Sequence, residues 1–322
     1  MSFSEFDLIE RFFLDLGPER ADVLLGIGDD CALLRPPEGH DLALSMDTLV
    51  AGRHFFPDVD PVSLGHKALA VNLSDLAAMG AEPAWASLAL TLPEIDEPWL
   101  RGFVRGFAEL AQRSGIRLVG GDTTRGPLSI TVQVQGLLPT GSGMRRSGAQ
   151  VGDFIFVSGT LGDAALALKV RQGSLALSGE TLTPLLRRLD RPEPRLQLAL
   201  AVRDIATACI DISDGLGADL NHICRRSGVA ALLQGDNLPL SEPVRDYLAG
   251  SGDWSLPLGG GDDYELCLTV APERVAELES RVTGLSPGLH QIGIIEAGKG
   301  VRCRLPDGEM LSHAAFGYDH FR

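Results

Sequence analysis

Carboxylates recur at short turns along this chain, and these acidic turns are the residues best able to do chemistry. Five such turns are present: Gly28-Asp29-Asp30, Ser45-Met46-Asp47, Gly120-Gly121-Asp122, Asp211-Ile212-Ser213-Asp214 and Gly261-Asp262-Asp263. Carboxylates gathered in one site repel one another unless divalent cations neutralise them. Oxygen ligands without a His or Cys companion favour Mg²⁺ or Mn²⁺, which bind through a few carboxylates together with substrate phosphates. The acidic turns therefore predict a site for phosphoryl transfer.

The glycine-rich turn at residues 120–126 is the central one. Its two glycines let the backbone turn tightly and approach a ligand closely, and they place Asp122 at the mouth of a sheet, between strands expected at 116–119 and 128–138. Two threonines and Arg125 follow and add hydroxyls and a fixed cation, which orient phosphate oxygens. The same composition is typical of a plain hairpin loop. The prediction of a phosphate site therefore depends on the other acidic turns.

A buried helix is predicted to supply one more acid. Pro61 marks its start and Gly80 its end, and apolar residues surround almost its whole circumference, so most of it is expected to be buried. Asn72 and Asp75 lie three residues apart and hence on one face. A carboxylate in such a helix is either paired or bound to a metal, and both readings stay open.

The pattern of apolar runs predicts two domains of mixed α/β type. In the first domain, residues 1–139, helices are expected at 4–16, 61–79 and 96–114, and strands at 23–27, 31–34, 42–46, 85–92, 116–119 and 128–138. The strand at 42–46 is expected to end at Asp47. Residues 139–148 are rich in Gly and Ser and read as a linker that carries Arg145 and Arg146.

The second domain, residues 150–322, is predicted to be an α+β domain. Strands are expected at 154–157, 209–211, 229–233, 264–270, 290–296 and 301–304, and helices after 163, at 181–190 and 194–207, from 215 to 226 and after Pro272. The turn at 158–163 resembles a phosphate cradle, but it lacks the lysine of the Walker spacing and is better explained as a glycine-rich turn with a helix cap. Ser213 or Asp214 is a candidate cap for the helix from 215.

Length and charge exclude several classes of partner. The 322 residues suffice for two cores, and the net charge of −15 disfavours nucleic acid and anionic membranes. The chain has only three lysines, so arginines and bound metal must supply most of the positive charge for an anionic substrate. The first residues show no basic region followed by an apolar block, and no apolar run of about 18 residues occurs in the sequence. We therefore expect a cytoplasmic protein.

The cysteines show neither redox nor zinc-binding spacing. They are odd in number, far apart and mostly within apolar runs, which is typical of reduced core residues. The five are Cys31, Cys209, Cys224, Cys267 and Cys303.

The acidic turns and their neighbours together resemble one family. The matching segments are Gly26-Ile27-Gly28-Asp29-Asp30-Cys31-Ala32, Asp47-Thr48-Leu49-Val50, the helix from Lys67 to Gly80, Gly120-Gly121-Asp122-Thr123-Thr124, Ile210-Asp211-Ile212-Ser213-Asp214-Gly215-Leu216 and Gly261-Asp262-Asp263-Tyr264-Glu265-Leu266. In this order they resemble the bacterial thiamine-monophosphate kinases, which belong to the ATP-binding superfamily that includes aminoimidazole ribonucleotide synthetase. The match extends to Gly317-Tyr318-Asp319-His320-Phe321 and so covers nearly the whole chain.

The resemblance implies a fold, an assembly and a reaction. It implies a two-domain α/β protomer whose N-terminal mixed sheet, with its helices, binds ATP and metal and packs against a second copy in a homodimer. The C-terminal domain is then a separate α/β domain. The implied reaction converts thiamine monophosphate and ATP into thiamine diphosphate and ADP.

The resemblance also assigns roles to residues of this chain. Around several Mg²⁺ ions it places Asp30, Ser45, Met46, Asp47, Asp75, Asp122, Asp211 and Asp214, with Met46 at a position where the family often has a hydroxyl residue. Against the ATP phosphates it places Gly121, Asp122, Arg146 and Ser213. On the thiamine side it places His54, Asp262, Asp263 and Tyr318. Asp47, Asp122 and Arg146 are the implied catalytic residues.

The predicted mechanism is direct in-line attack by the phosphate of thiamine monophosphate on the γ-phosphorus of ATP. A phosphate monoester has a second pKa of about 6, so the nucleophile is already ionised and no general base is required. This agrees with a sequence in which no Ser-His-Asp or Cys-His arrangement is evident.

Other readings of the same acids stay open. A metal-dependent phosphohydrolase would release phosphate without an acceptor, and a silent nucleotide-binding protein would bind MgATP without turnover. Within the superfamily, selenophosphate synthetase would need a reactive cysteine near the N-terminus, and residues 1–22 contain none. The hydrogenase-maturation dehydratase would need a cysteine at the C-terminus, where this sequence has His320-Phe321-Arg322. The Asp-Tyr-Glu-Leu turn at 263–266 disfavours aminoimidazole ribonucleotide synthetase itself.

Overall fold

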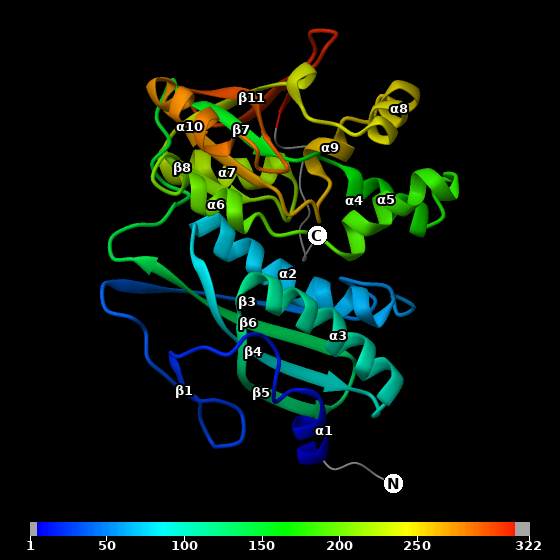
Figure 1. Cartoon of the computed structure of the whole chain (residues 1–322). Coiled ribbons are helices and arrows are strands. Elements are labelled where there is room, and N and C mark those ends of the chain that lie inside the picture. Colours follow the sequence, from blue (N-terminus) through cyan, green and yellow to red (C-terminus); the bar gives the residue numbers. More distant parts are fainter. Residues whose placement is uncertain (1–4, 313–322) are drawn as a thin grey trace. The chain divides into compact units, whose positions relative to one another are not determined.

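The computed structural model describes residues 5–312 of the chain (Figure 1). The chain forms two compact units. Unit 1 consists of Met1–Leu76 and Ala81–Ser142, and unit 2 of Ala77–Gly80 and Gly143–Arg322. Both units are of mixed α/β type, as predicted. None of the helices in the described part is long and apolar enough to span a membrane.

Unit 1 is built on a four-stranded sheet in the order β3-β6-β4-β5. The strands are β3 (His40–Val50), β4 (Glu82–Leu92), β5 (Arg117–Arg125) and β6 (Ser129–Pro139). The β6 strand pairs antiparallel with β3 and β4, while β4 and β5 run parallel. The short strands β1 (Val23–Leu25) and β2 (Leu33–Leu34) form a separate antiparallel pair. The sheet is therefore mixed, and β3 and β5 are its two edges.

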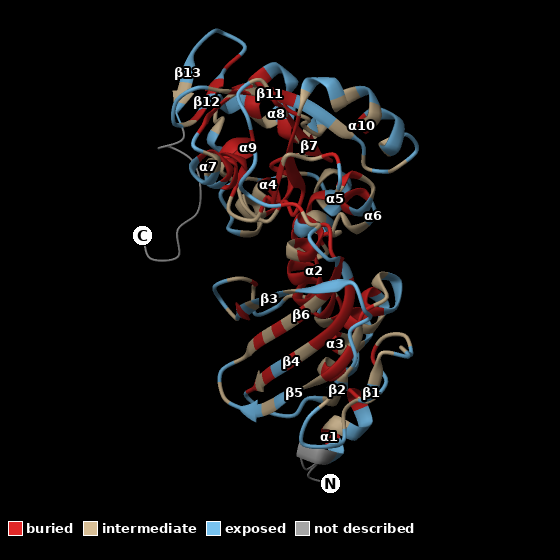
Figure 2. Cartoon of the chain, turned by 90° about the vertical axis from the view of Figure 1, so that its left-hand side faces the viewer, coloured by how far each residue is buried: buried red, intermediate tan, exposed pale blue. Residues whose placement is uncertain are grey.

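Helices cover one face of this sheet, and the other face, called the open face below, is covered only in part, where Val23 and Leu34 of β1 and β2 pack against Trp85 and Leu137. The helices are α1 (Glu5–Phe12), α2 (Pro61–Met79) and α3 (Glu97–Ser114). Along β6, Ile130, Val132 and Val134 are buried, whereas the residues between them are only half-buried (Figure 2). This alternation is expected for a sheet with one covered face.

Two glycines let α2 and α3 pack closely. A Cβ atom at Gly65 would overlap the carbonyl oxygen of Phe103, and one at Gly106 would overlap that of Val62. The α3 helix has the predicted ends: the Asp96 side chain accepts a hydrogen bond from the Trp99 amide, and Gly115 ends the helix in a left-handed conformation.

The glycine-rich segment at 120–126 is not the turn that its composition predicts. Strand β5 runs through it from Arg117 to Arg125, and the reversal to β6 falls on residues 126–128. The partner strand β4 supplies the reason, because it continues to pair with Thr123 and Thr124 after a register shift at Ala86 and Ser87. Asp47 likewise lies inside β3, not at its end, because β3 is paired with β6 along all of its length.

Unit 2 is built on a seven-stranded sheet in the order β13-β12-β9-β11-β7-β10-β8. The strands are β7 (Phe154–Ser158), β8 (Ala208–Asp211), β9 (Ala230–Gln234), β10 (Leu266–Val270), β11 (Leu289–Glu296), β12 (Gly300–Arg304) and β13 (Met310–Ser312). In the described part of this sheet, β12 and β9 pair in parallel, and all the other neighbouring strands pair antiparallel.

Both faces of this sheet are packed. On one face Ile155 and Ile210 join a core with Leu220 of α7, and on the other Phe156 and Leu268 join a core with Leu198 of α6 and residues of α10. The helices of unit 2 are α4 (Asp163–Arg171), α5 (Gly179–Asp190), α6 (Leu196–Val202), α7 (Leu216–Ser227), α8 (Glu242–Ser251), α9 (Ser255–Gly259) and α10 (Val275–Val282), with single 3₁₀ turns at Gly235–Asn237 and Pro272–Arg274.

Two predictions for this unit need correction, and two of its helices were not predicted. The helix expected at 194–207 ends at Val202, and α8 and α9 were not anticipated. The segment at 144–149 is not a free linker, because Met144 is buried and the Arg145 carbonyl accepts a hydrogen bond from the Cys209 amide of β8. Apolar burial and this backbone bond outweigh the loop-like composition of the segment.

Candidate active site

In unit 1, α2 and β3 bring three of the predicted residues together. The Ser45 hydroxyl donates to Asp75 Oδ2 at 2.5 Å. Two strand positions further on, the Asp47 amide donates to Asn72 Oδ1 at 2.9 Å, and the Asn72 side chain is in turn anchored on the Ala68 carbonyl. Asn72 and Asp75 thus share one helix face and meet the sheet, as their spacing predicts.

The register of the sheet separates Asp47 from Asp122. Asp47 lies opposite Val132, which pairs with Leu88, and Leu88 pairs with Gly121, so these four positions share the helix-covered face. Asp122 is the next residue and belongs to the open face, in the row that contains Thr48. One protomer therefore does not bring Asp47 and Asp122 together, because they lie on opposite faces and on opposite edge strands.

Met46 and Gly121 have different steric roles in this sheet. The side chain of Met46 projects from the open face and is 59% exposed, so its thioether points away from Ser45 and Asp47. A Cβ atom at Gly121 would overlap the carbonyl oxygen of Leu88, so only glycine fits there.

The other predicted site residues of unit 1 lie nearer the surface: Asp30 and Asp122 are exposed. The half-buried His54 accepts a hydrogen bond through Nδ1 from the Val50 amide at 3.0 Å.

In unit 2, the two acidic turns are hydrogen-bonded to each other. The Asp262 amide donates to the Ser213 carbonyl at 2.9 Å, and the Tyr264 amide to the Ile212 carbonyl at 2.8 Å. Asp211 lies buried at the end of β8, directly before the first turn. A Cβ atom at Gly261 would lie 2.5 Å from the Ser213 carbonyl oxygen, so glycine permits this close approach. Ser213, predicted for ATP, and Asp262, predicted for thiamine, are therefore neighbours within this unit.

The carboxylate of Asp219, in α7, binds the backbone of the first acidic turn of unit 2, residues 211–214. Its Oδ2 atom accepts hydrogen bonds from the amides of Ser213, Asp214 and Gly215 at 3.0–3.1 Å. Burial, with the nearby charges of Asp211 and Asp214, raises the pKa of Asp219 to about 8. Neither Ser213 nor Asp214 caps α7, since its N-cap residue is Gly215 without a side-chain cap. The predicted cap was wrong because a carboxylate inside the helix satisfies these amides instead.

Arg146 and Asp214 both act on His222 of α7. Burial lowers the pKa of His222, Arg146 and Arg225 lower it further, and Asp214 opposes them. Arg146 itself is exposed, and its carbonyl accepts a hydrogen bond from Ser227. The predicted phosphate contact Arg146 and the predicted metal ligand Asp214 thus influence the same side chain.

The second acidic turn has an unusual backbone. Asp262 and Tyr264 have φ angles of 67° and 49°, in the left-handed region that non-glycine residues seldom adopt. Asp263 is 2% exposed, and both of its carboxylate oxygens accept from the Gly162 amide at 3.1 Å. Burial raises the pKa of Asp263 well above its ordinary value, and the Arg188 charge opposes this. The Gly162 amide of the 158–163 turn is therefore already bound within the protein.

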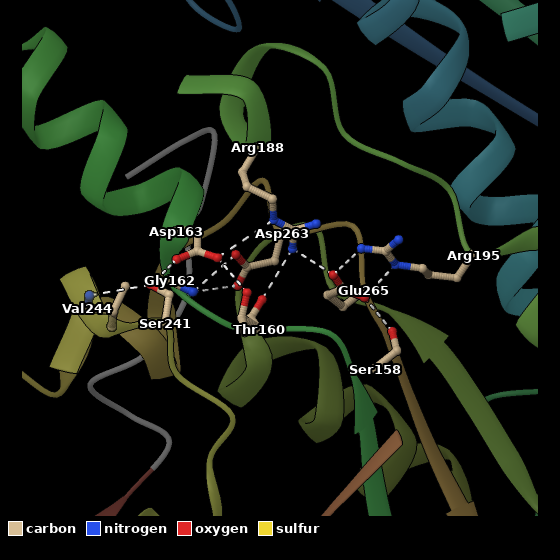
Figure 3. A network of polar contacts seen from close by, with 10 residues as sticks. All are labelled: Ser158, Thr160, Gly162, Asp163, Arg188, Arg195, Ser241, Val244, Asp263 and Glu265. Atoms are coloured by element: carbon tan, nitrogen blue, oxygen red, sulfur yellow. Dashed lines mark hydrogen bonds and ion pairs between the residues drawn. The ribbon is translucent and has the colours of Figure 1, made fainter. Parts of the chain in front are cut away.

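Glu265 is a residue whose role the sequence did not reveal. It is fully buried and lies at the centre of a network with Ser158, Arg188 and Arg195 (Figure 3). A cavity of about 640 Å³ opens beside Arg188 and Arg195 and is lined in part by α5 and the start of α8. The signal available in the sequence was the Asp-Tyr-Glu-Leu turn, which marks the segment but names no partner.

The described residues do not show a complete metal site. Among residues 5–312, no three His, Cys, Asp or Glu side chains form a group able to hold a metal ion by themselves. Tyr318 lies outside the described residues. The assignment of metal, ATP and thiamine contacts therefore stays a prediction.

Two family models cover most of the chain. The model "AIR synthase related protein, N-terminal domain" matches residues 28–138, and "AIR synthase related protein, C-terminal domain" matches residues 150–306. Among curated proteins, thiamine-monophosphate kinase of Salmonella typhimurium is 48% identical over 322 residues, which cover 100% of this chain and 99% of that protein.

Solved structures agree with these matches. Thiamine-monophosphate kinase from Stenotrophomonas maltophilia superposes with a TM-score of 0.84 at 48% identity, covering 90% of this chain and 93% of that one. AaThiL complexed with AMPPCP and TMP superposes with a TM-score of 0.77 at 32% identity, covering 92% of both chains.

Proposed function

The chain belongs to the thiamine-monophosphate kinase family and catalyses ATP-dependent phosphorylation of thiamine monophosphate, and we propose that it does so by direct in-line transfer assisted by Mg²⁺. The observation that carries this proposal is the pairing of the two acidic turns in unit 2, because it joins a turn proposed for ATP to one proposed for thiamine.

The nucleophile needs no activation by the protein. The second pKa of a phosphate monoester is about 6, so a phosphate oxygen of thiamine monophosphate is ionised at neutral pH. What the protein must supply is alignment of the two phosphates and neutralisation of their charge, which together dominate the barrier to phosphoryl transfer.

The donor set fits Mg²⁺, which prefers oxygen ligands. We propose that several Mg²⁺ ions are held among Asp30, Ser45, Met46, Asp47, Asp75, Asp122, Asp211 and Asp214, with Met46 limited to its backbone because the side chain points to the other face. Bound Mg²⁺ would neutralise charge on the transferring phosphate. The short bond from Ser45 to Asp75 and the anchored amide of Asp47 hold their side of this donor set in place.

The remaining residues divide between the two substrates. We propose Gly121, Asp122, Arg146 and Ser213 as contacts of the ATP phosphates, with Asp47, Asp122 and Arg146 as catalytic residues. His54, Asp262, Asp263 and Tyr318 are proposed on the thiamine side. We propose Asp262 as the contact from the second acidic turn, because the Asp263 side chain is buried against Gly162, whereas Asp262 is half-buried and is oriented by a hydrogen bond from the Tyr264 hydroxyl.

We further propose that the protein is a homodimer joined through the open face of the unit 1 sheet. That face carries an apolar stripe along β3, made of Leu42, Leu44, Met46 and Val50, all of them exposed. A contiguous apolar stripe on a sheet face is typical of a protein interface. Asp122 lies on the same face. A cytoplasmic location stays a prediction from the sequence.

The test is product analysis of the purified protein with MgATP and thiamine monophosphate, thiamine or no acceptor. We expect ADP and thiamine diphosphate with the monophosphate alone, since the hydroxyl of thiamine would need a base. Phosphate release in the absence of an acceptor would indicate a phosphohydrolase, and binding of MgATP without turnover a silent nucleotide-binding protein. Either outcome would rule out the kinase reaction for this protein.

A further inference from the structure

Glu265 has an environment that packing alone does not require. Its Oε2 atom accepts hydrogen bonds from the Ser158 hydroxyl at 2.5 Å and from Arg195 Nε at 2.6 Å. Its Oε1 atom accepts from Arg188 Nη2 at 2.6 Å and from Arg195 Nη2 at 2.5 Å. Figure 3 shows the carboxylate held between the two guanidinium groups, with the serine below it. A side chain with no exposed surface therefore has all its strong acceptor sites filled.

The surrounding chain is shaped to receive this carboxylate. A Cβ atom at Gly159 would overlap the Glu265 carboxylate, so glycine is needed there. Burial by itself lowers the pKa of Arg188, but the charges of Glu265 and Asp263 raise it above its ordinary value. A buried carboxylate is stable only with such compensation, and loss of one partner leaves an uncompensated charge.

The network adjoins the strained turn. Glu265 directly follows Tyr264, and the strand after it begins with the Leu266 amide, which donates to the Ser158 hydroxyl at 2.9 Å. Asp262 and Tyr264 have positive φ angles, and backbone in this region persists only where its surroundings impose it. The clamped Glu265 side chain anchors the exit of this turn, and the buried Asp263 anchors its middle.

The turn proposed for ATP has its own anchor. Asp219 binds its three amides from α7 and shares no recorded hydrogen bond with Ser158, Arg188 or Arg195 among the described residues. The two turns touch through their backbones but are held by separate carboxylates. A defect in one anchor should consequently affect one substrate more than the other.

We propose that Glu265, clamped by Arg188 and Arg195, is a positioning residue that presents the Asp262 side chain to thiamine monophosphate. This inference rests on the proposed function and adds to it a group that does not touch substrate. It assigns Arg188 of α5 and Arg195, which precedes α6, to substrate specificity, although neither belongs to an acidic turn.

The experiment measures KM for thiamine monophosphate, KM for ATP and kcat separately in Glu265→Gln, Arg195→Gln and Arg188→Gln. Each variant removes one charge-assisted hydrogen-bond partner, and we expect KM for thiamine monophosphate to rise about tenfold while KM for ATP changes by less than about twofold. Arg195→Lys, which keeps the charge, should restore part of the loss. Asp219→Asn should show the opposite pattern, with KM for ATP raised more. Arg281→Gln, which removes an exposed arginine paired with Asp204, is the matched control.

A merely structural network would give a different result. It would lower the folded fraction, and hence apparent kcat, with both KM values unchanged, or it would raise both KM values equally, and either pattern overturns the inference. If Glu265→Gln fails to fold, the two arginine variants decide the question. If the wild-type protein forms no thiamine diphosphate, the proposed function is wrong. If the wild-type protein is active and the variants keep its KM values, this inference alone is wrong.

Discussion

In unit 1, hydrogen bonds of individual polar side chains connect the elements that carry the proposed site residues. Asn72 binds the Asp47 amide, and Ser45 binds Asp75. Arg20 donates to the Gly115 carbonyl at 2.9 Å and to both carboxylate oxygens of Asp22. The bonds of Asn72, of Ser45 and of Arg20 to Gly115 each join segments that are distant in the sequence, which is what a site built from several elements requires.

The proposed metal ligands should be indispensable for turnover and dispensable for folding. Asp47→Asn and Asp122→Asn keep the size of the side chain but remove a charged oxygen ligand, so kcat should fall by at least about 100-fold. The thermal transition followed by circular dichroism should move little, because neither residue is in an apolar core. Near-full kcat at saturating Mg²⁺ in either variant would show that the residue is not a ligand.

Asp22 should confer pH-dependent stability. Burial would raise its pKa, but hydrogen bonds from Arg20 and Trp85 outweigh this and lower it. A lowered folded-state pKa means stability that is present above the unfolded value of 3.8 and lost as the pH falls through the folded value. We therefore expect Asp22→Asn to lower the free energy of unfolding at pH 7 by about 1 kcal/mol, and this difference to diminish as the pH falls below 3.8.

Denaturant titrations of wild type and Asp22→Asn at several pH values measure this effect. A difference in unfolding free energy that is the same at pH 7 and at pH 3 would contradict the assignment. Asp41→Asn, at an exposed acid of the same unit, serves as the control.

Among the elements, α2 and α3 cross in unit 1 with their backbones in close contact. Both helices carry a glycine where the other helix's backbone comes closest, at Gly65 and Gly106. The crossing thereby fixes the position of α2, which carries Asn72 and Asp75 toward β3. In unit 2 the comparable role falls to α7, whose Asp219 supports the first acidic turn.

Gly106→Ala should separate these helices. The added methyl group would meet the Val62 carbonyl, and such overpacking costs about 1–3 kcal/mol. We expect a clear fall in Tm and a fall in activity through displacement of Asp75. Gly250→Ala, within α8, is the control, since a Cβ atom there meets nothing within 4 Å and alanine favours a helix interior. An unchanged Tm in Gly106→Ala would mean that α2 and α3 can move apart freely.

For the whole molecule, the unequal faces of the unit 1 sheet are the main consideration. One face is packed against helices, and the other presents leucine and methionine side chains along β3. The negative net charge of −15 opposes association of two copies by long-range repulsion. Burial of the apolar stripe must outweigh that repulsion if two copies pack there.

Leu44→Asp should therefore weaken the dimer. Leu44 is 62% exposed in the middle of the stripe, and a carboxylate buried there would lack a partner. Sedimentation or light scattering should show a shift from dimer to monomer at micromolar concentration. Val151→Asp, at an equally exposed residue of unit 2, should leave the mass unchanged. A wild-type protein that is monomeric at all concentrations would rule out the proposed interface.

The sequence by itself determined the family, the mixed α/β class and the two acidic turns of unit 2, because motif order and turn composition are local properties of the chain. It also determined that Asn72 and Asp75 share a face, since helical spacing fixes this. Only the tertiary structure decided that residues 120–125 form a strand, because pairing with β4 overrides the glycines. It also decided that Asp47 and Asp122 face opposite ways, because strand register sets the face of each side chain.

The network around Glu265 could not be predicted for a related reason. Its partners Arg195, Arg188 and Ser158 lie 70, 77 and 107 residues away in the sequence, on separate elements. No local pattern relates them, and only the tertiary fold brings these opposite charges into one buried site. Long-range burial, which local composition does not encode, is thus the physical reason why the structure was needed.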